Sequence, residues 1–323
     1  LYGDQAAGTY FTKAVEQQPD DAARWAHRAR FCAFQGQLEQ AQADVERALE
    51  LAPDDWRIWA SRGEVHEKLE LWDEAAADFC KVLELQPQDR SFWTDRAEHY
   101  ATLKHWDAAA LLYSKLVELE PADTMTWLRA APLLVLAGDL EGYRKHCWEM
   151  LHQFADSGEV TVAERTCKAC LLLPDTIEVS KLPLKTFESA LDDGSAPSWF
   201  CKWGYSVRAL AAYRAGDADK AVDWIRKTQE SQGYTEVPSV PPLALSLLAM
   251  AQHQLGQAEQ ASQALAEASA LIDEHLPKLA TSELEGGWHD WLIAEILRRE
   301  AEQLTGTGDI GSGTNERSNG AAR

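Results

Sequence analysis

Four tryptophans recur at a constant interval in this chain. Trp25, Trp59, Trp93 and Trp127 are each 34 residues apart. A fixed period of this length indicates internal repeats, in which each copy is one supersecondary unit that cannot bury its apolar face alone. Neighbouring copies must therefore stack on one another, and the spacing predicts an elongated array of stacked units.

Other residue types keep the same period. Units that begin at Ala22, Trp56, Arg90 and Thr124 place the tryptophans at position 4 of each copy. The fourth copy keeps the pattern only in its first half. The matching residues are Ala29, Gly63, Ala97 and Ala131 at position 8; Ala41, Ala75, Ala109 and the departure Tyr143 at position 20; Val45, Phe79, Tyr113 and the departure Cys147 at position 24; and Pro53, Pro87, Pro121 and the departure Ala155 at position 32.

This pattern is typical of a pair of antiparallel helices. Small residues at positions 8 and 20 allow the two helices to cross closely, whereas the tryptophan and the bulky residue at position 24 fill the space between units. Proline at position 32 ends the second helix because it lacks an N–H and clashes with the preceding turn. Acidic residues such as Asp21, Asp55 and Asp89 suit the start of the next helix.

These motifs resemble the tetratricopeptide repeat family, whose unit is a helix–turn–helix of 34 residues. The resemblance implies an all-α fold, a right-handed solenoid of stacked antiparallel helix pairs with a C-terminal capping helix. No segment shows the alternation of a β-strand. We expect residues 1–19 to be the second helix of a truncated repeat, 20–157 regular units, 158–197 divergent helices, 198–275 two further units, 276–304 a loop and the capping helix, and 305–323 a disordered tail.

Composition limits the function classes. The 323 residues carry a net charge of −21, which argues against nucleic acid as a partner because phosphate binding needs clustered Lys and Arg. No apolar run is long enough to predict a membrane span. The six cysteines lack the spacing of a disulfide framework, so they favour free thiols in a reducing compartment and predict a cytoplasmic protein.

The resemblance also implies a binding surface. In this family the concave groove is lined by positions 2, 5, 9, 12 and 13 of the first helices, which implies a protein or peptide ligand and no cofactor. The groove has mixed charge, so we expect an extended peptide or a helix. The candidate residues are Arg30, Phe34, Arg57, Glu64, Glu67, Lys68, Ser91, Thr94 and Glu98.

One subfamily binds chaperone C-terminal carboxylates with Lys and Asn, and its pattern is not matched here. Only one of the corresponding residues is basic, and none is Asn. A chaperone carboxylate clamp is therefore not predicted. These residues are Ala26, Arg30, Ser61, Ser91 and Asp95.

Two motifs resemble functional sites, but one is better explained by helix packing and the other by its place in the expected tail. Cys167 and Cys170 form a C-x-x-C, yet a zinc site would need two more ligands at suitable spacing. They remain weak candidates for a thiol or metal site. The GTGDIG at 306–311 neither follows a strand nor opens a helix, so it does not predict nucleotide binding. No catalytic residue is predicted in this segment.

A narrower resemblance concerns several separate sequence blocks. The segments that start at 132, 162, 213 and 288 are similar to the tetratricopeptide region of large planctomycete-type bacterial proteins, in which the array often follows a serine/threonine kinase or WD40 domain. This resemblance implies the C-terminal interaction region of a multidomain signalling protein, with possible contact to an upstream domain. The alternatives are a free-standing adaptor and, less favoured, a thiol or metal enzyme.

Overall fold

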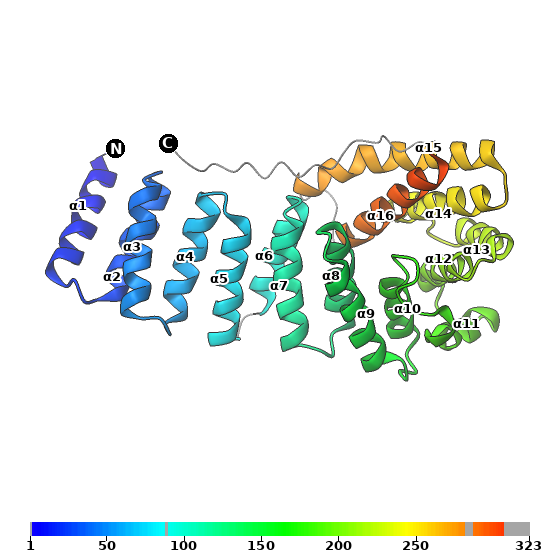
Figure 1. Ribbon diagram of the computed structural model, residues 1–323, viewed down its shortest axis with the longest axis horizontal. Helices are drawn as coiled ribbons and strands as arrows, with labels where there is room; N and C mark the ends of the chain where they lie inside the picture. Colours follow the sequence, from blue (N-terminus) through cyan, green and yellow to red (C-terminus); the bar gives the residue numbers. More distant parts are fainter. Residues whose placement is uncertain (1, 88–89, 282–286, 307–323) are drawn as a thin grey trace.

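The chain folds as an all-α solenoid. A computed structural model describes residues 2–87, 90–281 and 287–306, and within these ranges every regular element is helical. The helices stack side by side into an elongated array, and α14 to α16 lie against the later part of it (Figure 1).

The helices of the first half are α1 (Tyr2–Gln17), α2 (Ala22–Phe34), α3 (Leu38–Leu51), α4 (Trp56–Lys68), α5 (Trp72–Leu85), α6 (Arg90–Thr102), α7 (Trp106–Leu119), α8 (Thr124–Leu136) and α9 (Leu140–Phe154). Those of the second half are α10 (Val160–Cys170), α11 (Leu184–Asp192), α12 (Ser198–Arg214), α13 (Ala218–Glu230), α14 (Val240–Gln254), α15 (Ala258–His275) and α16 (Trp288–Thr305), with short 3₁₀ helices at Val179–Lys181 and Leu276–Thr281.

The 34-residue register coincides with the helix starts. The first helices α2, α4, α6 and α8 begin at Ala22, Trp56, Arg90 and Thr124. Aspartates cap three of them: Asp21, Asp55 and Asp123 each accept a hydrogen bond from the backbone N–H two residues later, at 2.9–3.1 Å. Asp89 and residues 307–323 of the tail expected over 305–323 lie outside the described residues, whereas Thr305 is the last residue of α16.

The repeat tryptophans tie each unit to the preceding one. The indole Nε1–H of Trp25 donates to the carbonyl of Pro19 at 2.8 Å. The same bond joins Trp59 to the carbonyl of Pro53 at 2.7 Å, and it recurs at Trp127 and Pro121 at 3.0 Å. In these three places the proline that follows a second helix thus also supplies an acceptor that fixes the start of the next unit.

Within a unit, the two helices cross at small residues. The position-20 alanines of the first three units are fully buried. Gly63 is needed at position 8 of the second unit because an added Cβ would lie 2.4 Å from Cε1 of the Phe79 ring. Phe79 itself is fully buried and packs on Trp93 with ring centroids 5.4 Å apart.

A buried ion pair also joins the two helices of each of the first two units. The Arg28 Nε–H donates to Asp44 at 2.6 Å, and the Arg62 Nε–H donates to Asp78 at 3.0 Å. Both carboxylates are about 1% exposed. His66 adds a 2.8 Å contact to Asp78. These pairs occupy positions 7 and 23 of the repeat and hold the helices at a fixed offset.

The region after α9 departs from the period because bulky side chains replace small ones. Tyr143 at position 20 is fully buried, and its hydroxyl donates to the carbonyl of Ala169 at 2.8 Å. This contact draws α10 onto α9. The regular arrangement returns with the pairs α12–α13 and α14–α15, which are joined by close packing within each pair.

The last helix does more than cap the end of the stack. α16 packs on α14 and α15 and also reaches back to α8. The indole of Trp288 lies 5.7 Å from the ring of Tyr113, centroid to centroid, and nearly all residues of 288–297 are buried. Farther along α16, Glu300 accepts from Arg214 of α12 at 2.7 Å.

A second buried charge cluster fixes the start of α16. Lys168 of α10 lies 2.8 Å from Glu164 and 3.5 Å from Asp290, and all three are at most 8% exposed. Burial alone would lower the pKa of Lys168, but the two carboxylates outweigh it and raise the pKa, so the ammonium stays charged. No helix in the described part combines the length and hydrophobicity that a bilayer span requires.

We expect Gly63→Ala to destabilise the chain by about 1–3 kcal/mol, since the methyl group would overpack against Phe79. Helix propensity alone would predict the opposite, because alanine favours a helix more than glycine does. Denaturant unfolding followed by circular dichroism measures the effect. Gly158→Ala is the control, because its Cβ would meet nothing within 4 Å. An unchanged or raised stability of Gly63→Ala would contradict the close crossing.

Lys168→Ala should cost about 3–5 kcal/mol, because it leaves two buried carboxylates without their counter-charge. The matched control is Lys181→Ala, which removes a 3.2 Å pair with Glu178 whose side chains are more than 60% exposed and should cost less than about 1 kcal/mol. Equal losses in guanidinium unfolding of the two variants would argue against a structural role for the buried cluster.

Candidate functional site

A groove runs along the first helices of the first three units. It consists of three cavities: about 610 Å³ between α1, α2 and α4, about 280 Å³ between α2 and α4, and about 390 Å³ between α4, α5 and α6. Glu64 lines all three. Arg30 lines the first two, and Trp56 lines the last two. The cavities therefore form one continuous surface, called here the open groove.

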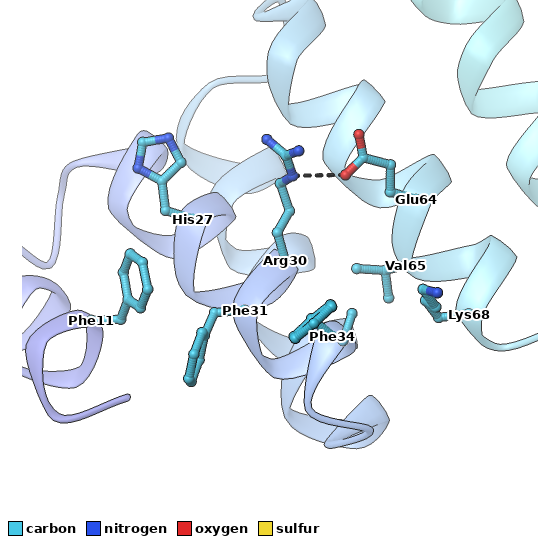
Figure 2. Close-up of a pocket in the computed structure, with 9 residues that line it drawn as sticks. Phe11, His27, Arg30, Phe31, Phe34, Glu64, Val65 and Lys68 are labelled. Carbon is cyan, nitrogen blue, oxygen red and sulfur yellow. Dashed lines mark ion pairs between the residues drawn. The ribbon is translucent and has the colours of Figure 1, made fainter. Parts of the chain in front are cut away.

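Aromatic side chains line the first cavity (Figure 2). Phe11 of α1 and Phe31 of α2 lie with ring centroids 5.3 Å apart, and Phe34 is 79% exposed at the cavity edge. Across from them, Arg30 pairs with Glu64 through a 2.7 Å Nε–Oε2 contact that bridges α2 and α4. This end of the groove thus offers both apolar area and charge.

The third cavity is lined mainly by aromatic and aliphatic side chains. Phe79 and Trp93 are buried in its lining, whereas Phe92 remains 49% exposed. The Arg96 guanidinium carbon lies 4.2 Å from the Phe79 ring centroid, within cation–π range. Arg96 is held there by Glu67, which accepts its Nη2–H at 3.1 Å.

The open groove contains five of the nine groove residues that the sequence predicts. Glu67 instead bridges α4 to α6, since it also accepts from the Tyr100 hydroxyl at 2.6 Å. Ser91, Thr94 and Glu98 do not line the three cavities, and Glu98 lies 3.8 Å from Arg129. The five that line the cavities are Arg30, Phe34, Arg57, Glu64 and Lys68.

Of the aromatic side chains on this surface, the sequence predicts Phe34 but not the others. Phe92 and Trp56 stand at repeat positions 3 and 1, outside the positions that the family uses for its groove, and Phe11 comes from the first helix of the chain. The paired Arg28–Asp44 and Arg62–Asp78 were also missed. Their signal is an Arg and an Asp 16 residues apart, repeated once in register.

The concave face does not stay open along the whole array. In the fourth unit, the groove positions 5 and 9 are Leu128 and Pro132, and both are buried in α8, on which α10 and α16 pack. In the second unit, position 9 is the half-exposed Glu64. The face is therefore apolar and filled at α8, and charged and accessible at α2 and α4.

The C-x-x-C cysteines lie in the core. Cys167 is fully buried and Cys170 is 1% exposed. Burial raises the pKa of the Cys167 thiol, and for Cys170 a hydrogen bond with Cys147 and burial both raise the pKa. The thiolate is the reactive form, so both thiols are held in their inert state. No group of three metal-ligating side chains occurs in the described ranges.

Comparisons with family models identify the repeats directly. Models of the tetratricopeptide repeat match residues 33–89 and 72–124, and a second such model matches residues 202–227 and 242–267. No curated protein shows significant sequence similarity to the chain. The chain thus contains tetratricopeptide repeats in both halves, which indicate a protein–protein interaction scaffold.

Comparison with solved structures gives matches of low sequence identity. A tetratricopeptide repeat protein from Parabacteroides merdae has 15% identity and a TM-score of 0.32, covering 86% of this chain and 92% of its own. YrrB, a protein with an unusual peptide-binding site, has 19% identity and a TM-score of 0.29, covering 73% and 95%. The Cut9–Hcn1 hetero-tetramer of the APC/C has 14% identity and a TM-score of 0.39, covering 92% and 52%.

Phe34→Ser should leave the free energy of unfolding within about 0.5 kcal/mol of the parent chain, because the ring is 79% exposed. Phe187→Ser, at a fully buried ring, should cost about 3–5 kcal/mol. Denaturant unfolding of both variants makes the comparison. A large loss for Phe34→Ser would mean that this ring stabilises the fold and is not presented to a partner.

Proposed function

We propose that the open groove is the surface with which this interaction scaffold holds a segment of a partner protein, as an extended peptide or a helix. The supporting observation is the continuity of three cavities across α2, α4 and α6, with Phe34 and Phe92 left exposed in them. Exposed apolar surface bordered by polar groups marks interaction sites. The segment itself has no catalytic role in this proposal and requires no cofactor.

We also propose a context for the array. The block resemblance supports the C-terminal interaction and regulatory region of a multidomain bacterial signalling protein, such as a serine/threonine kinase, in which the groove recruits a substrate or contacts the upstream domain. The six cysteines are free, which fits a reducing, cytoplasmic location. A coding sequence that continues upstream of Leu1 into a kinase domain would support this context, and a start codon directly before Leu1 would contradict it.

The principal alternative is a free-standing adaptor that uses the same groove. It shares the binding surface, so only the upstream coding sequence separates the two. A thiol or metal enzyme based on Cys167 and Cys170 is disfavoured by their burial and their raised pKa values. Metal analysis and thiol titration of the folded protein test it, and bound zinc or rapidly reacting thiols at these positions would revive it.

Photo-crosslinking in the native host tests the use of the groove. A benzophenone amino acid at position 34 or 92 should capture the same partner protein at both positions, because both side chains face the open groove. The control position is Trp148 of α9, which is 61% exposed and does not line the groove. We expect at least about tenfold more of that partner from the groove positions; equal capture at position 148 would refute the proposal.

A further inference from the structure

The open groove is locally basic in a strongly acidic chain. Four Arg or Lys side chains line it against two carboxylates, whereas the whole chain carries −21. Charges farther than about 8 Å are largely screened at physiological ionic strength, so a bound segment senses the groove rather than the distant acidic surface. The basic side chains are Arg30, Arg57, Lys68 and Arg96, and the carboxylates are Asp55 and Glu64.

Two of these cations are presented to solvent. The Arg57 side chain is 71% exposed and lies over the Trp56 ring, with its guanidinium carbon 5.1 Å from the centroid. Its contact with Asp55 is long, at 3.6 Å. Among the described residues no carboxylate forms an ion pair with Lys68, which lines the cavity at the other end. Both groups are available to carboxylates of a partner.

The third cavity adjoins the one that Arg57 lines, because the two share Trp56, Ala60 and Glu64, and it suits an apolar anchor. Its volume of about 390 Å³ is enclosed by aromatic and aliphatic side chains from α4, α5 and α6, and Phe92 stands half exposed in it. Binding energy at interfaces concentrates where an aromatic or large aliphatic side chain fills such a pocket. The Arg96 guanidinium, which is paired with Glu67, packs on Phe79 next to the anchor position.

From this combination we infer that the partner is an acidic peptide segment that carries one large aromatic or aliphatic anchor. The anchor enters the cavity formed by α4, α5 and α6, and carboxylates of the same segment meet Arg57 in the adjoining cavity between α2 and α4 and Lys68 in the cavity between α1, α2 and α4. The inference rests on the proposed use of the groove and names the chemistry of its ligand.

A displayed library of random twelve-residue peptides tests this inference on the intact chain. Peptides are selected on the parent chain and counter-selected on Phe92→Ser, which opens the anchor cavity. Ala60→Phe, which fills the same cavity from α4, provides an independent block. Both substitutions lie at partly exposed positions, and unchanged helicity and unfolding midpoint show that the variants remain folded.

Charge is tested with a matched pair of double variants. Arg57→Glu with Lys68→Glu reverses the two presented cations of the groove. Arg47→Glu with Lys81→Glu makes the same charge change on the second helices α3 and α5, where both side chains are exposed and pair with a glutamate three residues away. Fluorescence anisotropy of the selected peptides should show at least tenfold weaker binding to the groove variant and less than twofold weaker binding to the control.

The possible outcomes distinguish the acidic partner from the use of the groove itself. Acidic peptides with one large apolar residue, sensitive to the groove substitutions, are the expected result. Neutral or basic peptides that lose affinity with Phe92→Ser would leave the groove as the binding surface but overturn the acidic partner, as would acidic peptides indifferent to the charge reversal. If no peptide survives the counter-selection on Phe92→Ser, or if the survivors bind Ala60→Phe as well as the parent chain, both the acidic partner and the proposed use of the groove are refuted.

Discussion

The hydrogen bond from three of the four repeat tryptophans to the proline carbonyl of the preceding unit sets the geometry of the regular array. In these three places the proline lies two residues beyond the end of the second helix, so its carbonyl has no partner within that helix. The indole supplies the missing donor and in doing so fixes where the next first helix begins, at 2.7–3.0 Å in three units. Because the first helices start in equivalent places, their inner faces align, and the cavities of α2, α4 and α6 become continuous.

Arginine has two separate roles in the repeats, and the position of the arginine in the repeat determines its role. Arg28 and Arg62, at position 7, are turned into the helix pair and meet a buried aspartate. Arg30 and Arg57, at positions 9 and 2, are turned to the groove and keep more than half of their surface exposed. The buried pairs specify how the helices of one unit sit together, and this leaves the groove cations free of a structural duty within the pair.

The sequence predicts the units well because their determinants are local. Small residues at the helix crossing, the terminating prolines and the aspartate caps act over a few residues each, and the helices begin where the register places them. The same reasoning could find Arg30 and Phe34, which lie on the inner face of one helix. It could not find Phe11 or Phe92, because their place in the groove depends on how neighbouring units pack.

The position of α16 was predictable only in part. An amphipathic final helix was expected, but its contact with α8 joins residues more than 150 positions apart. One signal was present in the sequence: the groove positions of the fourth unit turn apolar at Leu128 and Pro132, whereas the second unit has Arg57 and Glu64 at groove positions. An apolar stretch on an inner face indicates that something in the chain covers it.

The reach of α16 changes how the array responds to load. Regular repeats contact only their neighbours, so each interface can bend or open independently. α16 joins α8 to α12 and α14, whose helix pairs lie far along the stack from the unit of α8. Opening any one of these interfaces therefore also disturbs the contacts of α16. We expect the later half to unfold as a single cooperative block. The elasticity of the chain is then concentrated in the first three units, where the open groove can widen or narrow around whatever occupies it.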